Sequence, residues 1–359
     1  MFRSVQALTG AVISGSTALQ FFARAHWTAS DLDVYVEHSS GYLMALFLIS
    51  IGYDFEPTNS QNWSISDAYD QINLTEVYDD GRGFACVFNF HRGSSKIQLI
   101  TATYSPIDII LNFHSTVVMN LITARHAFCL YPQASFEEHT SLITFRDEGI
   151  DRNFAWEKYV ERGWTLVNAD GSLWGVWNNE DAPTLPLDSF QLSKPRHIGD
   201  RFSWTIKLSP LRTAARDYTQ DTLTWISSLP YSIPRPLIVT ASRDNLELFT
   251  AHSWILTHSG LAVTASYIVL QDPVVKYVYC FVKERTLLEL IHQWVLDARQ
   301  KMEGKQKVGL VGAFAHALMT LLQKISKPQP PQTEPEIEIN DTQLHSLAMQ
   351  YYMRWRGAV

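Results

Sequence analysis

Residues 12–34 read VISGSTALQFFARAHWTASDLDV, and the interpretation of the whole chain starts from this stretch. A short apolar lead-in is broken by small residues at Gly15-Ser16, after which Leu19 and Phe22 have the spacing of one buried helix face. The stretch ends in Asp31-Leu32-Asp33, where polar and apolar residues alternate as they do in a strand. It therefore combines a turn suited to an anion with a strand that carries two carboxylates.

The turn predicts an anion site at the start of a helix over Thr17–Arg24. We expect Ser16 to be the N-cap of this helix. A helix N-terminus presents free N–H groups and a partial positive charge, which attract phosphate. Gly15 lets a phosphate approach the backbone closely, and Ser16 adds a hydroxyl group.

The two carboxylates predict a cation site on the strand. Asp31 and Asp33 are two residues apart and point the same way, while Leu32 and Val34 point into the core. Asp is uncommon in strands, and two adjacent carboxylates repel one another unless a cation joins them. Hard oxygen ligands suit Mg²⁺, which is typically held by a few carboxylates together with substrate phosphates.

The run from Gly15 to Val34 resembles the signature of the DNA polymerase β-type nucleotidyltransferase superfamily. That signature is an apolar residue, Gly, Gly or Ser, a spacer, and an acid–apolar–acid strand; here 14 residues separate Ser16 from Asp31, at the long end of the usual spacer. The resemblance implies an α+β fold with a nucleotidyltransferase-type mixed sheet flanked by helices. It also implies that Ser16 and the adjacent backbone hold a nucleoside triphosphate, while Asp31 and Asp33 hold Mg²⁺ or Mn²⁺.

The activity that this resemblance implies is Mg²⁺-dependent transfer of a nucleotidyl group from an NTP to a hydroxyl acceptor, which the residues do not identify. The chain also resembles a group of fungal proteins that share a Gly-Ser-x-Ala-Leu-x-Phe-Phe start, here Gly15–Phe22, and a Phe-His-Ser-Thr segment, here Phe113–Thr116. The second resemblance implies no activity.

Lys158 is a further candidate for contact with the triphosphate. Residues Asn153–Arg162 read as a helix that ends at Gly163. Enzymes of the nucleotidyltransferase type often use a basic residue from the helical part that follows the acidic strands. The alternative is that Lys158 lies on a solvated helix face.

The family pattern has a third carboxylate on a later strand, and this chain departs from it there. Phe84–Phe90 and Lys96–Thr101 predict a hairpin around the loop His91–Ser95. The second strand offers Gln98, whose amide is uncharged and a poor base. A second reading is therefore a catalytically impaired binding or regulatory module, a possible pseudoenzyme.

No other acid is a good replacement. Glu37 lies roughly 13 Å along the strand from Asp33, at about 3.3 Å per residue. Asp108 is better explained as a first-turn acid of a helix, which the apolar spacing extends over Ile107–Thr123. The sequence therefore predicts one divalent cation more strongly than two.

Charge argues against a long nucleic acid as partner. The formal net charge is −7, and no block of Lys and Arg appears, so a basic face of the kind that binds duplexes is not expected. Arg82, Arg92 and Lys96 could form a modest patch, but ordinary surface charges explain them equally well. A nucleotide or a small acceptor fits the composition better.

Composition favours an intracellular, cytoplasmic protein without a membrane span. Cys86, Cys129 and Cys280 lie in apolar surroundings without zinc spacing, which indicates reduced core thiols. No stretch reaches the ~18 apolar residues of a membrane helix, and Tyr42–Tyr53 has the length of a buried helix.

Four segments are expected along the 359 residues. They are a nucleotidyltransferase-like domain over 1–125, a C-terminal α+β region of unknown role over 126–326, a Pro- and Glu-rich flexible linker over 327–341, and an amphipathic helix over 342–359. Within the second segment we expect strands at 203–206, 265–270 and 275–282 and a helix at 245–256. The oligomeric state cannot be inferred from these patterns.

Overall fold

The computed structural model describes residues 1–27, 30–72, 83–144, 151–176, 183–209, 224–225, 228–229, 252–259, 262–270 and 278–280. The chain divides into two compact units. The first comprises residues 1–192, 199–242 and 256–265, and the second comprises residues 193–198, 243–255 and 266–359. All five candidate site residues lie in the first unit.

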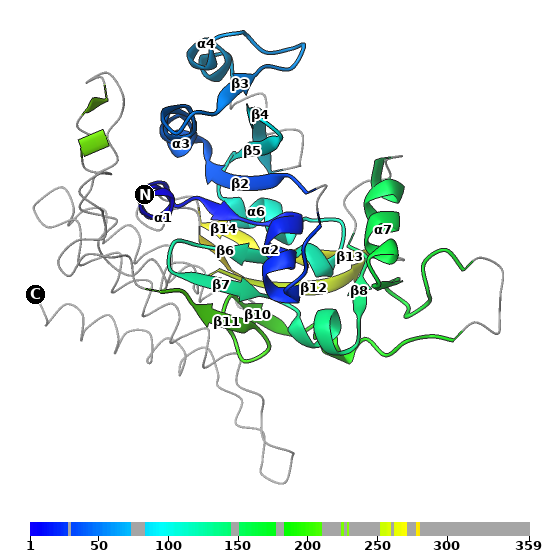
Figure 1. The fold of residues 1–359 in the computed structure, drawn as a ribbon. Coiled ribbons are helices and arrows are strands. Elements are labelled where there is room, and N and C mark those ends of the chain that lie inside the picture. The colour runs from blue at the N-terminus through cyan, green and yellow to red at the C-terminus, as the bar shows by residue number, and fades with distance from the viewer. Residues whose placement is uncertain are drawn as a thin grey trace, which may run out of the picture. The chain divides into compact units, whose positions relative to one another are not determined.

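An eight-stranded mixed sheet forms the centre of the first unit. Figure 1 shows its strands from β3 at the top to β11 at the bottom. The order is β3 (Asp54–Glu56), β4 (Phe84–Arg92), β5 (Ser95–Ala102), β2 (Leu32–Glu37), β1 (Val12–Ile13), β6 (Asn120–Ile122), β7 (His126–Cys129) and β11 (Trp204–Lys207). Strands β2 and β5 are parallel, and the other neighbours are antiparallel. The expected mixed sheet of an α+β protein is therefore confirmed.

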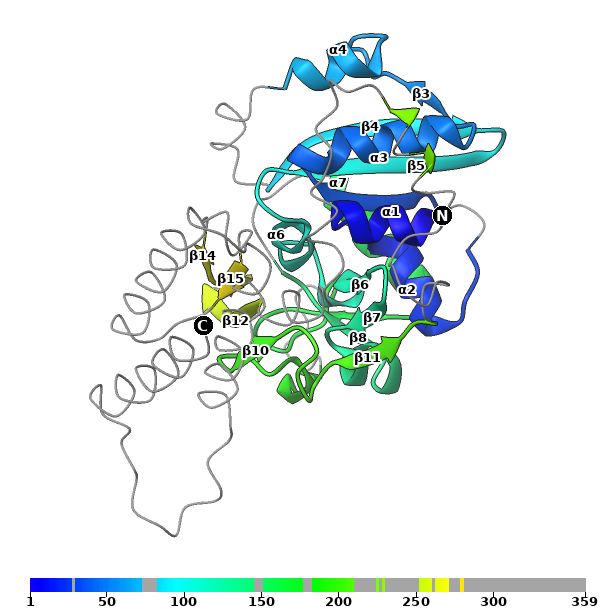
Figure 2. The ribbon, with the colours of Figure 1, turned by 90° about the vertical axis from the view of Figure 1, so that its left-hand side faces the viewer.

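Three helices cover one face of the β2–β5–β4 part of this sheet: α1 (Phe2–Thr9), α3 (His38–Ser50) and α4 (Ile65–Asp70). Figure 2 shows α3 along β4 and β5 and α1 along β2. Met44 and Phe47 of α3 pack with Val34 and Phe88 of the sheet, and all four side chains are buried. Each such burial contributes about 1.5–3 kcal/mol. The helix predicted over Tyr42–Tyr53 is confirmed, although it begins earlier.

The other side of β2 faces a second set of helices, which carry part of the candidate site. These are α2 (Gly15–Ala23), α6 (Pro106–Leu111) and α7 (Asp151–Glu161). Leu19 of α2 packs with Val117 and with Tyr159 of α7, and Tyr35 of β2 meets the ring of Phe113 at 5.8 Å. Helix α7 matches the expected helix, and Gly163 follows it with φ +99°.

The predicted hairpin is confirmed as β4–β5, but its loop is shorter than expected. His91 pairs with Lys96 and Arg92 with Ser95, so only Gly93 and Ser94 remain in the turn. Gly93 has φ +58°, a conformation that glycine adopts without strain and that a two-residue hairpin turn requires. Extending the pairing leaves Gln98 in the strand, where it was placed from the sequence.

The helix predicted over Ile107–Thr123 is wrong beyond Leu111. The chain continues as a 3₁₀ turn, η2 (Thr116–Val118), and then as β6. The Val117 N–H donates to Ser141 Oγ, and the Leu142 N–H donates to Thr116 Oγ1, both at 3.0 Å. The first bond gives the Val117 N–H a partner in β8 (Thr140–Leu142) in place of a helical carbonyl, and the second ties the Thr116 side chain to the same strand, so tertiary contacts override the apolar spacing.

Later segments match the predictions unevenly. The strand expected at 203–206 is β11, and those expected at 265–270 and 275–282 overlap β13 (Ala262–Ser266), β14 (Ile268–Leu270) and β15 (Val278–Cys280). The helix expected at 245–256 is wrong from Ser253 onward, because β12 (Ser253–Ser259) pairs with β10 (Pro195–His197) and buries Trp254. The remaining elements are η3 (Gln133–Glu137), β9 (Thr165–Val167), which pairs with β8, and η4 (Asp188–Phe190). Residues 245–251, the linker and the terminal helix lie outside the described residues.

Candidate functional site

The turn between β1 and α2 brings the start of a helix onto the carboxylate of Asp33. Gly15 opens α2 with φ +65°, and a Cβ atom added there would lie 2.7 Å from Asp33 Oδ2. A glycine is therefore required twice over, for its backbone conformation and for the space it leaves. In the structure that space is taken by the Asp33 carboxylate.

Ser14, not Ser16, is the N-cap of α2, so the expected cap position is wrong by two residues. The Ser14 hydroxyl donates to the carbonyl of Asn120 rather than accepting from the helix, and its N–H donates to the Asp33 carbonyl at 3.3 Å. The first turn of α2 thus has no side-chain cap from Ser14. Uncapped N–H groups at a helix start are donors that an anion can satisfy.

Asp31 and Asp33 stand together at the beginning of β2. Strand pairing begins at Leu32, one residue after Asp31, and Val34 and Val36 are fully buried on the opposite side of the strand. The Thr17 hydroxyl of α2 donates to the Asp31 carbonyl at 3.0 Å and ties the helix to this point. The predicted alternation of acidic and apolar positions is thereby confirmed.

Burial and the neighbouring charge of Asp31 both disfavour ionisation of Asp33. Burial, and then the charge of Asp31, raise the pKa of Asp33 from 3.8 to about 6, against the opposing effect of Lys158 and Lys96. A carboxyl group shifted in this way is one whose negative charge is incompletely compensated. A further cation beside Asp31 and Asp33 would relieve that repulsion.

Lys158 of α7 contacts the start of α2, although the two helices lie far apart in the sequence. Its Nζ donates to Ser16 Oγ at 3.1 Å, and the Tyr159 hydroxyl lies 3.2 Å from the same oxygen. Burial and the neighbouring Arg162 lower the pKa of Lys158, whereas Asp33 and Asp31 raise it. The structure therefore brings together Gly15, Ser16, Asp31, Asp33 and Lys158, the five residues singled out in the sequence.

Arg162 is a neighbour that the sequence reading did not single out. Its guanidinium Cζ lies 4.0 Å from the centre of the Trp27 ring, and its Nη2 donates to Ser30 Oγ at 3.5 Å. Its Nη1 is buried and has no hydrogen-bond partner among the described residues. The spacing of four residues between Lys158 and Arg162, which places both on one helix face, is the signal that could have identified it.

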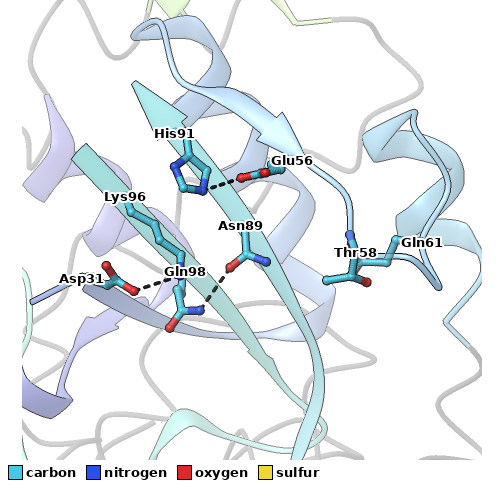
Figure 3. Close-up of polar contacts among 8 residues, drawn as sticks. All are labelled: Asp31, Glu56, Thr58, Gln61, Asn89, His91, Lys96 and Gln98. Carbon is cyan, nitrogen blue, oxygen red and sulfur yellow. Dashed lines mark hydrogen bonds and ion pairs between the residues drawn. The ribbon is translucent and has the colours of Figure 1, made fainter. Parts of the chain in front are cut away.

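Strand β5 lies beside β2 and carries Lys96 and Gln98, which Figure 3 shows near Asp31. Asp33 pairs in register with Gln98, so the third-acid position holds an amide, as expected from the sequence. Gln98 Nε2 donates to Asn89 Oδ1 at 3.1 Å. Two residues earlier, Lys96 Nζ lies 3.0 Å from Asp31 Oδ2. Lys96 thus lies beside the two carboxylates, in a partly exposed ion pair.

No third carboxylate joins Asp31 and Asp33 within the part of the chain that the structure describes. No group of three or more His, Cys, Asp and Glu residues there is arranged to hold a metal ion. Glu56 on β3 is paired with His91 at 2.6 Å, as drawn in Figure 3. The Asp108 side chain lies in the first turn of α6 and accepts a hydrogen bond from Asn112. Asp79 and Asp80 lie outside the described residues.

Comparison of the chain with protein-family models, with curated proteins and with solved structures finds no match. None of the helices in the described ranges combines the length and apolar character that crossing a bilayer requires. Cys86 and Cys129 are free thiols, and Cys129 is buried, as expected for core cysteines.

Proposed function

We propose that this chain has a nucleotidyltransferase-type fold that binds a nucleoside triphosphate with Mg²⁺ and transfers its nucleotidyl group to a hydroxyl acceptor. One observation carries the proposal. The start of α2 meets the Asp33 carboxylate at Gly15 and the Lys158 ammonium group at Ser16, and the charge of Asp31 acts on Asp33 beside it. Anion donors and cation ligands stand side by side there, as a metal–nucleotide complex demands.

The triphosphate would bind on the α2–α7 side. The N–H groups at the start of α2 donate hydrogen bonds, and Lys158 supplies a positive charge to the phosphate oxygens. The Ser16 hydroxyl, which now accepts from Lys158, adds a donor when it turns toward the ligand. Arg162, on the same face of α7, has a buried Nη1 that no described residue accepts from, and its positive charge stabilises this side further.

The residues on the β2 side fit one divalent cation. Asp31 and Asp33 offer hard oxygen ligands, and the raised pKa of Asp33 marks a negative charge that a cation would stabilise. Mg²⁺ bound there would supply charge stabilisation to the phosphates during transfer.

In the reaction proposed, the acceptor hydroxyl oxygen forms a bond to the α-phosphorus, the bond from that phosphorus to the bridging oxygen breaks, and pyrophosphate leaves. The proton of the hydroxyl must pass to solvent or to a carboxylate. Gln98 cannot accept it, because a neutral amide is a very weak base. The helix start and Lys158 hold the leaving pyrophosphate.

A second candidate function is a nucleotide-binding or regulatory module without transfer. The observation in its favour is Gln98, whose amide is paired with Asn89 opposite Asp33. This arrangement retains the groups that bind a metal–nucleotide complex but lacks the base of the family pattern.

Incubation with α-³²P-labelled ATP and either Mg²⁺ or Mn²⁺ distinguishes the candidates. We expect the wild type to bind the nucleotide in a metal-dependent way and an Asp31→Asn/Asp33→Asn variant to lose binding at least tenfold. The matched control is Asp54→Asn/Glu56→Gln, which removes two exposed carboxylates from the edge strand β3. Label transferred to an added hydroxyl compound by the wild type and control alone supports the enzyme, and binding without transfer supports the module. Equal binding by all three proteins would refute both.

A further inference from the structure

We propose that Lys96 is a built-in cation of the nucleotide site, which occupies the side of Asp31 where a second divalent ion would bind. The site then takes a single divalent cation, which arrives with the nucleotide. This inference rests on the proposed nucleotide site and holds for either candidate function.

The strand register places Lys96 beside Asp31. Strands β2 and β5 run parallel, with Leu32 opposite Ile97 and Asp33 opposite Gln98. One residue earlier on each strand, Asp31 and Lys96 meet, with 3.0 Å between Oδ2 and Nζ. Because side chains alternate along a strand, Lys96 and Gln98 share the sheet face of the two carboxylates. Figure 3 shows both side chains directed to this face.

The ammonium group competes with a metal ion for the same oxygen. A Mg²⁺ ligand oxygen lies at about 2.0–2.1 Å from the ion, so an ion on Asp31 Oδ2 would stand beside Nζ at short range. Two cations on one carboxylate oxygen repel each other strongly. The Lys96 ammonium group stays because it is covalently attached to the chain, and the metal ion is excluded from this oxygen. The other oxygen of Asp31 is left to share an ion with Asp33.

Gln98 reinforces the same outcome. It stands opposite Asp33, where a carboxylate would complete a second ion site, but it brings no charge and donates its amide N–H to Asn89. The two positions of β5 nearest the carboxylates therefore carry a cation and a neutral amide. Neither adds a negative charge to hold a second divalent ion.

The charge of the whole cluster points the same way. Asp31 and Asp33 are offset by Lys96 and Lys158, so these four side chains sum to zero when all are ionised, and Arg162 beside Lys158 adds one positive charge. A cluster without net negative charge attracts free Mg²⁺ weakly. The negative phosphates of a nucleotide supply the attraction instead, which is why the ion should enter together with the nucleotide.

Counting bound Mn²⁺ tests this inference on the full chain. The probe is Mn²⁺ with the α,β-methylene analogue of ATP, and free Mn²⁺ is measured by electron paramagnetic resonance. We expect little Mn²⁺ binding to the wild type alone and one Mn²⁺ per protein–nucleotide complex. Lys96→Met should tighten the binding of nucleotide-free Mn²⁺ about tenfold, since it removes a positive charge near the carboxylates. Lys96→Arg, which keeps the charge, should behave as the wild type.

The outcomes separate two kinds of failure. Two Mn²⁺ ions per complex in the wild type, or unchanged Mn²⁺ affinity in a folded Lys96→Met variant, would overturn the inference while the nucleotide site stands. Failure of the wild type to bind the analogue at all would overturn the proposed function and the inference together. Far-ultraviolet circular dichroism and the melting temperature check that each variant is folded, and the partial exposure of Lys96, 33%, favours tolerance of the change.

Discussion

The two sides of the candidate site differ in how well their side chains suit a charged ligand. On the α2–α7 side, Lys158 and Tyr159 meet Ser16 at the start of a helix, and these three side chains can donate hydrogen bonds to an anion. On the β5 side, Lys96 and Gln98 stand where carboxylates would strengthen metal binding. The difference teaches that holding a nucleotide and reacting with it make separate demands on a fold, and the groups of this site fit the first demand of the proposed function better than the second.

The junction between the two sides should be the most sensitive point. Gly15→Ala places a Cβ 2.7 Å from Asp33 Oδ2 at φ +65°, so we expect a loss of about 3 kcal/mol in the free energy of unfolding and loss of nucleotide binding. Urea denaturation measures the first effect and titration with a fluorescent ATP analogue the second.

Gly10→Ala is the matched control for this change. Gly10 has a similar φ of +69°, but nothing lies within 4 Å of the added Cβ. We expect it to cost about 1 kcal/mol, from backbone strain alone, and to leave binding intact. Equal losses for the two variants would show that the contact between Gly15 and Asp33 does not matter.

The anion side should lose affinity when its ammonium group is removed. Lys158→Met keeps most of the apolar stem but deletes the charge that reaches Ser16, so we expect MgATP binding to weaken tenfold to a hundredfold, or about 1.4–3 kcal/mol. Isothermal titration calorimetry gives the affinity. Lys207→Met serves as control, because Lys207 is exposed on β11, with β7, β6 and β1 between it and β2. Similar affinities for the two variants would contradict the role of Lys158.

Ionisation of Asp33 should destabilise the folded protein when no metal ion is bound. The pKa of Asp33 is about 6 in the folded protein, above the usual 3.8, so the folded state holds a proton that the unfolded chain releases between these values. Stability of metal-free protein should therefore fall as pH rises from about 4 to 6. A pKa raised from 3.8 to about 6 corresponds to about 3 kcal/mol, which solvent screening of the partly buried Asp33 reduces to about 2 kcal/mol.

Asp33→Asn isolates this effect. The variant should lack the decline and be more stable than the wild type at pH 7.5 in metal-free buffer, as is common when a binding residue is removed. Urea unfolding at a series of pH values gives both curves. Asp54→Asn, at an exposed edge position, should follow the wild type. A wild-type curve parallel to that of Asp33→Asn would show that ionisation of Asp33 does not destabilise the folded state.

Much of the site could be predicted from local pattern, and the reasons are physical. Alternation along β2 and the hairpin signal of β4–β5 determine which side chains share a face, so Gln98 could be placed beside Asp33. The Lys96–Asp31 pair depends on that same register, but an ionic contact between two partly exposed side chains leaves no trace in the composition.

The contacts of α7 and the end of α6 at Leu111 could not be predicted without the tertiary structure. Lys158 and Arg162 approach the site because α7 packs on α2 through Tyr159 and Leu19, which are 140 residues apart in sequence. The apolar spacing after Leu111 predicts a helix wrongly, because the Val117 N–H bonds to Ser141 of β8 and the Thr116 hydroxyl accepts from Leu142. Periodicity records burial, and different backbone conformations can bury the same residues.

The smallest expected effect comes from restoring a carboxylate on β5. Gln98→Glu places a third negative charge opposite Asp33 and removes the amide N–H that bonds to Asn89. In metal-free buffer at pH 7.5 we expect a loss of about 0.5–1 kcal/mol in unfolding free energy, the size of a like-charge pair on neighbouring strands. Added Mn²⁺ should recover that loss in the variant and change the wild type little. Asn89→Asp, which adds a charge one strand further from β2, is the control and should recover less. If Mn²⁺ stabilised the wild type as much as Gln98→Glu, the β5 side would already hold its metal without a third carboxylate, and the contrast between the two sides of the site would disappear.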